Sequence, residues 1–170
     1  MILNGNINLH CLKNLKEISS RAFDFFSEVH NKSNNHFYIV PGGRTPRLFY
    51  NLLASQITNW GKTKFILSDE RLTHNNILSN TSMVGEIFIK NSTSNYGPEL
   101  IKYNIDGTQY VVEKKLKSLK PKIAILGLGV DGHTASLFPG DSNIFNNTND
   151  ITICTKKDGE DFNRISLTFN

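Results

Sequence analysis

Short β-rich runs alternate with amphipathic helical runs along the chain of 170 residues, and this alternation strongly limits the folds that the chain can adopt. Neither an internal repeat nor a long linker interrupts it. Such a pattern is typical of α/β domains, in which helices cover a largely parallel sheet. Because 170 residues suffice for one hydrophobic core and are few for two, we expect a single domain over residues 1–170. The expected fold is an open, mostly parallel, Rossmann-like sheet with helices on both faces.

The spacing of apolar residues places the individual elements. The predicted helices cover residues 15–30, 48–57, 81–89 and 108–119, with Thr108 as a candidate N-cap for the last. The predicted strands cover residues 7–12, 36–40, 62–68, 122–128, 151–155 and 164–169. The run 122–128 is the most apolar, which is typical of a central parallel strand buried on both faces. The Asn-rich segment 141–150 is expected to be a surface loop.

Composition excludes several classes of protein. The longest apolar runs are far shorter than the roughly 18 residues that cross a bilayer, and the first residues lack the features of a secretory signal. We therefore expect a cytoplasmic protein with no membrane partner. Cys11 and Cys154 lie far apart and outside any CxxC pattern, so that neither a zinc site nor a disulfide is expected, and both thiols should be reduced.

The net charge of +4 does not by itself indicate a nucleic-acid partner. Basic residues are spread along the chain, and the densest cluster, at 114–120, has the helical spacing of a solvated helix face. The sequence contains no recognisable motif that reads bases. A small anionic substrate would use the same charge more locally.

Three polar clusters each follow a predicted strand directly. They occupy residues 41–46, 69–71 and 126–140. In an open parallel sheet, ligands bind beyond the carboxyl ends of the strands, where loops and helix N-termini converge. This coincidence is the main functional signal in the sequence, and it predicts one site built from the three clusters.

The first cluster suits an anion. Gly42 and Gly43 let the backbone turn tightly with its N–H groups exposed, Thr45 can cap the next helix, and Pro46 suits that helix's first turn. A phosphate is favoured at such a helix N-terminus, and Arg44 with the Thr45 hydroxyl would add charge-assisted hydrogen bonds. An ordinary strand-to-helix turn explains the local chemistry equally well.

The second cluster, Asp69-Glu70-Arg71, is weak evidence when taken alone, because such triplets commonly form surface ion pairs. Its position at a strand end raises its functional weight. One carboxylate could orient a catalytic group, and Arg71 could hold developing negative charge.

The third cluster contains a literal GxGxxG at Gly127, Gly129 and Gly132, the fingerprint of dinucleotide-binding domains. We reject that interpretation because Pro139 and Gly140 end the expected helix after about two turns, and no acidic residue closes the next strand to hold a ribose. No cofactor is therefore predicted. No spacing of His, Cys and carboxylates predicts a metal site either.

What remains in the third cluster is a histidine beside an aspartate. Asp131 could hold one tautomer of His133, and His133 could then take a proton from water near neutral pH, which is general-base chemistry. Ser136 lacks the GxSxG nucleophile elbow and is interpreted as a helix residue. His74, after the second cluster, could at most line the pocket.

Together these segments resemble the 6-phosphogluconolactonase family, within the larger group that also holds the glucosamine-6-phosphate isomerases or deaminases. Members carry a GG[RS][ST]P loop, a DER loop followed by an SN pair, a GxGxDGHTASLFPG segment and an RITLT strand. The matching residues here are 42–46, 69–71 with 79–80, 127–140 and 164–168. The third motif is long and nearly complete, and the resemblance extends from about His36 to Thr168.

The resemblance implies hydrolysis of 6-phospho-D-glucono-1,5-lactone to 6-phosphogluconate, the second step of the oxidative pentose phosphate pathway, without metal or organic cofactor. His133, oriented by Asp131, would be the general base. Arg71 would stabilise the oxyanion or position the substrate, and Asp69 would hold Arg71 or a sugar hydroxyl.

The resemblance also implies a subsite for the 6-phosphate. Gly42, Gly43, Arg44 and Thr45 would bind it, together with Arg164. The expected partner is a small phosphorylated sugar lactone.

Two alternatives remain: a phosphosugar isomerase or deaminase, and a non-catalytic sugar-phosphate binding remnant. The isomerase branch typically has DEY in place of residues 69–71 and an acidic residue in an FNEP-like segment in place of 136–139, so that its ring-opening acid is missing here.

Family members usually continue for several strands and helices beyond the RITLT strand. The resemblance therefore implies a sheet that is incomplete at the C-terminal end and a chain less stable than a full-length relative. Two explanations stay open: the sequence is a fragment, or the protein is naturally short and its exposed apolar surface needs a partner, for example through self-association of the unfinished sheet.

Overall fold

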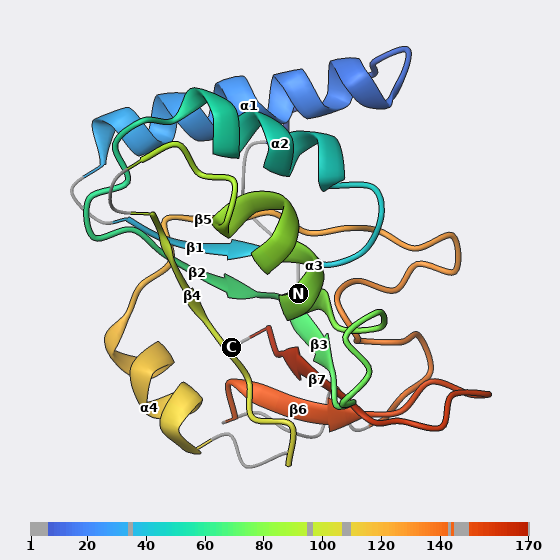
Figure 1. Ribbon diagram of the computed structural model, residues 1–170. Coiled ribbons are helices and arrows are strands. Elements are labelled where there is room, and N and C mark those ends of the chain that lie inside the picture. The colour runs from blue at the N-terminus through green and yellow to red at the C-terminus, as the bar shows by residue number, and fades with distance from the viewer. Residues whose placement is uncertain are drawn as a thin grey trace.

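A computed structural model describes residues 7–33, 36–94, 97–106, 110–142, 144 and 150–169 (Figure 1). Its helices are α1 (Leu15–Lys32), α2 (Arg47–Gln56), α3 (Asn80–Val84), which continues as the π-helical turn η1 (Gly85–Ile89), and α4 (Tyr110–Ser118). Its strands are β1 (Phe37–Val40), β2 (Lys64–Leu67), β3 (Asp69–Arg71), β4 (Glu99–Ile101), β5 (Ile123–Ala124), β6 (Thr152–Thr155) and β7 (Arg164–Leu167).

The strands form two sheets. The first has the order β4-β2-β1-β5 and is parallel throughout, while the second has the order β3-β7-β6 and is antiparallel. The predicted α/β architecture with a mostly parallel sheet is confirmed. The antiparallel sheet was not predicted, because its pairing joins segments that are distant in sequence.

Ser68 connects the two sheets. It follows β2 and precedes β3, its N–H donates to the Val40 carbonyl of the first sheet (2.8 Å), and its carbonyl accepts from Leu167 N–H beside the second (2.8 Å). The chain therefore passes from one sheet to the other at a single buried residue, at the carboxyl end of β2.

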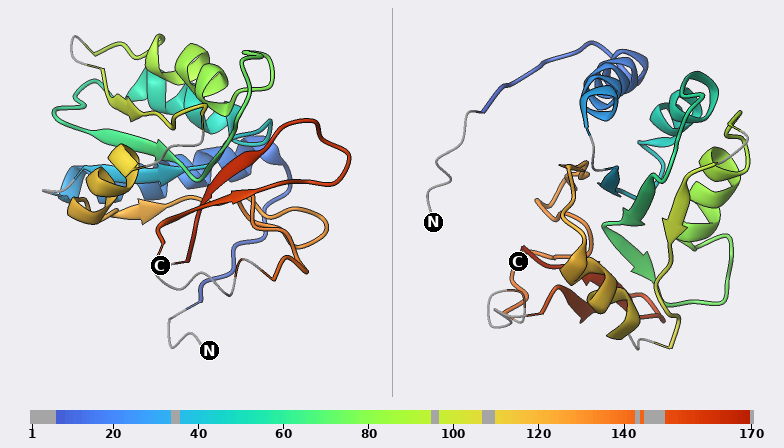
Figure 2. Two further views of the ribbon diagram at one scale, coloured as in Figure 1. Left: turned by 90° about the horizontal axis from the view of Figure 1, so that it is seen from below. Right: turned by 90° about the vertical axis from the view of Figure 1, so that its left-hand side faces the viewer.

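Helices cover both faces of the parallel sheet, as predicted. Helices α1 and α2 lie on one face with η1 beside them, and α4 lies on the other (Figure 2). The start of α1 is a reciprocal cap: the Asn14 side chain accepts from Glu17 N–H (3.0 Å), and the Glu17 carboxylate accepts from Lys13 N–H (3.1 Å).

The core between α1, α2, η1 and the sheet is rich in aromatic rings. The most central are Phe26, Tyr38, Trp60, Phe65 and Phe88, all at most 1% exposed. Neighbouring centroids in this group lie 4.7 to 6.4 Å apart. Burying each such ring contributes about 1.5–3 kcal/mol, so this cluster is the rigid base on which the strand ends rest.

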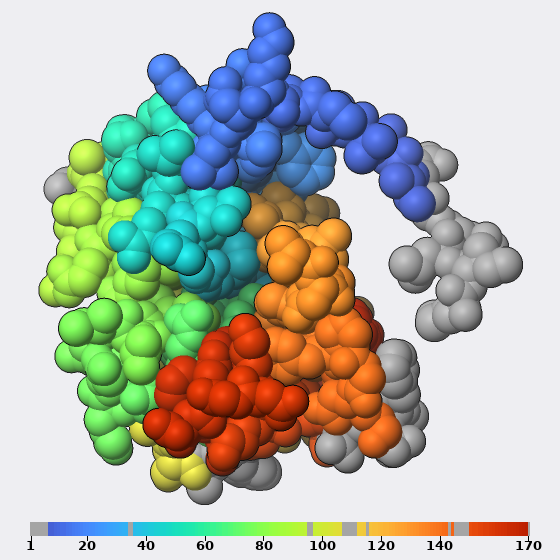
Figure 3. Space-filling model, turned by 90° about the vertical axis from the view of Figure 1, so that its right-hand side faces the viewer, coloured from blue at the N-terminus to red at the C-terminus, as the bar shows by residue number. Residues whose placement is uncertain are grey.

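One predicted strand is absent, and another is shorter than predicted and lies at the edge of the sheet. Residues 7–12 join no sheet; they extend away from the start of α1, and Ile7 is 89% exposed (Figure 3). The run 122–128 is not a central strand, because only Ile123 and Ala124 pair with β1, at the edge of the sheet, and Leu128 is 81% exposed. Apolar composition does not show whether a partner lies on both sides of a strand.

The other predicted elements agree with the structure to within a few residues, except at 69–71, where a strand replaces a loop. Thr108 and most of 141–150 lie outside the described residues. No helix in the described part of the chain is long and apolar enough to cross a membrane. Cys11 and Cys154 are exposed and unpaired with one another.

Candidate active site

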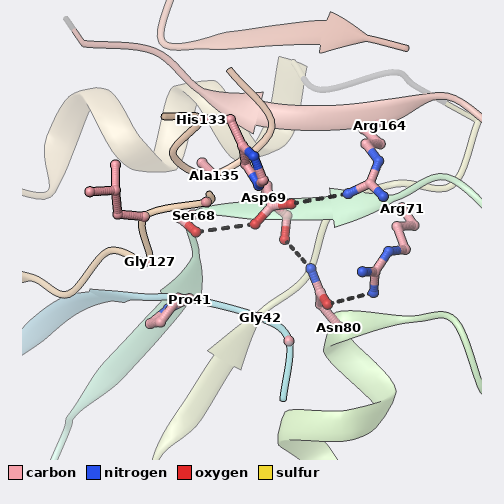
Figure 4. A pocket seen from close by; sticks show the side chains of 13 residues that line it. Pro41, Gly42, Ser68, Asp69, Arg71, Asn80, Gly127, His133, Ala135 and Arg164 are labelled. Atoms are coloured by element: carbon pink, nitrogen blue, oxygen red, sulfur yellow. Dashed lines mark hydrogen bonds and ion pairs between the residues drawn. The ribbon is translucent and has the colours of Figure 1, made fainter. Parts of the chain in front are cut away.

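A small cavity of about 180 Å³ lies where β1, β2 and β5 end (Figure 4). Three loops that follow these adjacent parallel strands meet there, as expected for an open sheet. The cavity is lined by Pro41, Gly42, Gly43, Ser68, Asp69, Arg71, Asn80, Gly127, Leu128, Gly129, His133, Ala135 and Arg164. The lining residues include members of all three polar clusters and six of the nine predicted site residues.

His133 borders the cavity, with Asp131 behind it. The Nδ1 atom of His133 lies 2.5 Å from Asp131 Oδ1, and the same oxygen accepts from His133 N–H at 3.3 Å. Because a carboxylate only accepts, Nδ1 carries the proton shared with Asp131, and in the neutral ring the lone pair is then on Nε2. The hydrogen bond from His133 lowers the pKa of Asp131, which keeps this carboxyl ionised. Asp131 does not line the cavity and acts on it only through His133.

A glycine-rich turn shapes the backbone around this histidine. Gly129 N–H donates to the His133 carbonyl (2.8 Å), and a Cβ at position 129 would overlap the imidazole ring. Gly132 has φ +87°, a conformation open to glycine, and Ala135 has φ +51°, which is uncommon for a residue with a side chain. Strained backbone of this kind is concentrated at functional sites.

Asp69 faces the cavity from β3 and is 7% exposed. Its carboxylate accepts from Ser136 Oγ (2.7 Å) and Ser68 Oγ (3.2 Å), and Arg164 Nη1 lies 3.8 Å from it. The expectation that Asp69 holds Arg71 is wrong. Arg71 Nη1 donates instead to the Leu78 carbonyl (2.8 Å) and to Asn80 Oδ1 (2.9 Å). These acceptors lie just before and at the start of α3, whereas the Asp69 carboxylate is engaged by Ser68 and Ser136.

Glu70 has a different function from its neighbour. Its carboxylate is buried and accepts from Asn80 N–H (2.8 Å), Thr81 N–H (2.6 Å) and Ser79 Oγ (3.1 Å) at the start of α3. It also accepts from its own neighbour, Arg71 N–H (2.7 Å). These bonds occupy both oxygens with the N-terminus of α3, so Glu70 holds the helix and Asp69 is the carboxylate turned toward the cavity.

Asn80 joins the first two clusters. Its Nδ2 donates to the Asp69 carbonyl (3.1 Å), while its Oδ1 accepts from Arg71. A Cβ at Gly42 would overlap the Asn80 carboxamide, so glycine at 42 allows the 41–43 loop to approach β3. The sequence motif pointed to Asn80 only as part of an SN pair; its contacts depend on the tertiary fold.

Arg164 enters the cavity wall from β7 and is 8% exposed. Its Nε and Nη2 donate to the two oxygens of Glu160 (2.7 and 2.6 Å), and its guanidinium lies 5.9 and 5.7 Å from the ring centroids of Phe138 and Phe162. Its Nη1 lies 3.4 Å from Ser136 Oγ. Glu160 was not singled out from the sequence, because nothing local distinguishes it from other acidic loop residues.

Ser136 is not in a helix, contrary to the prediction. Residues 134–137 form a tight turn closed by Leu137 N–H to the Thr134 carbonyl (2.9 Å). Ser136 is fully buried in it, donates to Asp69, and has its N–H bonded to Ser166 Oγ (3.2 Å).

Arg44 and Thr45 are exposed and do not line the cavity. The N-cap of α2 is Pro46, one residue later than predicted, and no side chain caps this helix. Arg47 N–H donates to the Arg44 carbonyl (3.4 Å). The next N–H groups of a helix have no acceptor within the helix, so the start of α2 can offer donors to a ligand. Among the described residues, no group of three His, Cys, Asp or Glu is placed to hold a metal ion.

Comparison with known proteins supports the same assignment of segments. The family model of glucosamine-6-phosphate isomerases/6-phosphogluconolactonase matches residues 15–170. The chain belongs to this family. A 6-phosphogluconolactonase of Helicobacter pylori is 28% identical in an alignment 163 residues long, which covers 91% of this chain and 70% of the relative.

Solved structures agree with the family fold. The 6-phosphogluconolactonase of Thermotoga maritima superposes with a TM-score of 0.75 at 25% identity, covering 93% of this chain and 75% of the other. That of Shewanella baltica gives a TM-score of 0.73 at 26% identity, covering 91% and 70%. The cavity described above is thus built on the fold shared by this family.

Proposed function

We propose that this protein hydrolyses 6-phospho-D-glucono-1,5-lactone to 6-phosphogluconate. The observation that carries the proposal is the pair Asp131 and His133 at the edge of a cavity whose facing wall holds Asp69 and Arg71. The names of the relatives in the family support the substrate.

His133 supplies the base. With Nδ1–H donated to Asp131, Nε2 takes a proton from a water molecule as the water oxygen attacks the lactone carbonyl. Asp131 keeps the ring in this tautomer and stabilises the imidazolium that forms. A positioned base of this kind typically contributes about 10² to 10⁴ in rate.

The attack forms a tetrahedral oxyanion, which needs donors. Arg71 lies in the cavity wall, with its orientation held by Asn80 and the Leu78 carbonyl. It stabilises the oxyanion or holds the substrate. When the tetrahedral intermediate collapses, the bond to the ring oxygen breaks, and this oxygen takes the proton from His133, leaving a carboxylic acid that ionises.

Asp69 offers its carboxylate to a sugar hydroxyl at the cavity. Its two oxygens already accept from Ser68 and Ser136, which fixes their direction, and a carboxylate can accept further hydrogen bonds. The 6-phosphate binds at the start of α2, with the N–H groups of Gly42 and Gly43 as donors and Arg44 and Thr45 at the exposed side of the same loop.

A panel of substrates tests the proposal. We expect the chain to accelerate hydrolysis of 6-phosphogluconolactone above the spontaneous rate. The acceleration of unphosphorylated gluconolactone hydrolysis should be at least tenfold smaller, because a charge-assisted phosphate site is worth about 1.5–3 kcal/mol. Release of ammonia from glucosamine 6-phosphate without lactone hydrolysis would favour the isomerase or deaminase branch. Binding of 6-phosphogluconate without any turnover would indicate a binding remnant.

A further inference from the structure

Arg164 is held more tightly than any other cation at the cavity described here. Glu160 binds its Nε and Nη2 in a two-pronged pair, with Arg164 9% and Glu160 22% exposed at their side chains. Phe138 and Phe162 flank the guanidinium. This arrangement leaves Nη1 as the edge that points toward Ser136 and Asp69. A two-pronged pair sheltered in this way has a fixed direction as well as a charge.

Glu160 also determines the charge of the cavity wall. Apart from His133, the charged side chains that line the cavity are Asp69, Arg71 and Arg164, whose sum is one positive charge. Glu160, directly behind Arg164, brings the sum to zero. The positive charge of Arg164 is then largely satisfied before any ligand enters.

The proposed reaction makes this balance important, because it changes the charge of the ligand. The lactone carries only its phosphate charge, whereas the product carries an additional carboxylate, formed at the carbon that water attacks. The family resemblance assigned Arg164 to the phosphate, but its Nη1 points toward Ser136 and Asp69. Since His133 borders the same small cavity, we place Arg164 beside the new carboxylate instead. A free arginine there would bind the product more tightly than the substrate and delay its release.

We propose that Glu160 is a specificity-determining residue that neutralises Arg164 and so prevents tight binding of the carboxylate product. This inference rests on the proposed function. It assigns Glu160 an effect on the difference between two ligands, which a purely structural role would not produce.

Calorimetric titration of the whole chain with two ligands tests the inference. The ligands are 6-phosphogluconate and glucitol 6-phosphate, which share the phosphate and differ in the carboxylate. For Glu160→Gln we expect 6-phosphogluconate to bind about threefold to tenfold more tightly than to the wild type, as for one partly screened charge, and glucitol 6-phosphate to change less. Glu160→Asp, which keeps the charge, should restore wild-type affinities.

One control and a second test variant accompany the titration. Glu28→Gln removes a carboxylate from an exposed pair with Lys32 (2.8 Å) on α1, far from the cavity lining, and should leave both affinities unchanged. Glu160→Ala removes the same charge as Glu160→Gln without adding an amide. It is used in the titration if the Glu160→Gln variant does not fold.

The inference is overturned if neither Glu160→Gln nor Glu160→Ala raises the preference for 6-phosphogluconate over glucitol 6-phosphate. It is also overturned if neither variant binds 6-phosphogluconate. This outcome is separate from failure of the proposed function, because the titration requires no turnover. A wild-type chain that does not hydrolyse the lactone would contradict the function, whatever the titration shows.

Discussion

At position 129, the absence of a side chain leaves room for the His133 ring against the backbone. Local geometry of this kind determines where the base stands, since Gly129 also donates to the His133 carbonyl. The same relation holds at Gly42, where the missing Cβ admits Asn80. At both positions, a neighbouring side chain occupies the space that a Cβ atom would need, which explains the glycine.

Gly129→Ala should therefore impair catalysis more than folding. The added methyl group displaces the imidazole, and a displacement of about 1 Å can cost about 10²-fold in rate. We expect lactone hydrolysis to fall by about 10-fold to 100-fold, measured beside the thermal unfolding curve. Gly85→Ala is the matched control, because a Cβ there meets no atom within 4 Å and Gly85 lies outside the cavity lining. Equal rates for the two variants would refute this account of Gly129.

Glu70→Gln should destabilise the fold at the start of α3. The buried carboxylate accepts from two backbone N–H groups and a serine hydroxyl there, and charged hydrogen bonds are worth about 1.5–3 kcal/mol each before compensation. We expect a loss of about 1–3 kcal/mol in the free energy of unfolding, measured by urea denaturation. Glu86→Gln, in an exposed pair with Lys90, should cost less than about 0.5 kcal/mol. Equal losses would contradict the capping role.

At the scale of elements, the sequence predicted the helices, which depend on local patterns, but not the strand pairings between distant segments. The helix predicted over 15–30 is confirmed as α1, because the spacing of apolar residues is a local signal. The strand predicted over 7–12 is absent, since a β-rich run does not reveal whether a partner exists. The antiparallel sheet depends on contacts between β3 and β7, about 95 residues apart, that no short pattern encodes.

The same division holds for the candidate site. The loop motifs led to Asp131, His133 and Arg71 because their residue types follow strand ends. Ser136 and Glu160 were not expected at the site, since their importance comes from partners on other elements.

The packing of α1 on β1 predicts a pH dependence of stability. Burial lowers the pKa of His30, whose ring lies 3.0 Å from the Tyr38 hydroxyl and 3.3 Å from His36 Nδ1. Below pH 6.5, the ordinary pKa of histidine, His30 is protonated in the unfolded chain but stays neutral in the folded chain until a lower pH is reached. The free energy of unfolding therefore falls as the pH decreases.

We expect the free energy of unfolding to be lower at pH 5 than at pH 7.5, and His30→Gln to show a smaller difference between the two. Urea denaturation at both values measures it. The exposed His74→Gln should keep the wild-type difference. A wild-type difference that persists in His30→Gln would assign the effect to other groups.

At the scale of the whole molecule, the cavity lies where two sheets meet. Its lining includes β3 and β7 of the antiparallel sheet as well as loops that follow the parallel strands. Ser68 carries the chain across this junction. A ligand in the cavity therefore contacts both sheets at once.

Binding of 6-phosphogluconate should stabilise the whole fold. At a ligand concentration of one hundred times Kd, linkage predicts a gain of about 2.7 kcal/mol in the free energy of unfolding. Unfolding curves with and without the ligand measure the gain, and gluconate without phosphate should give a smaller one. A single transition that does not move at saturating ligand would contradict the placement of the site.

The rate of 6-phosphogluconolactone hydrolysis by the wild type and by His133→Ala tests the central claim most directly. We expect the wild type to exceed the spontaneous rate, and His133→Ala to lose about 10²-fold to 10⁴-fold of that acceleration, while His74→Ala keeps it. Asp131→Asn should fall between them, because it removes the partner that fixes the tautomer. Hydrolysis by a folded His133→Ala chain at the wild-type rate would show that His133 is not the base.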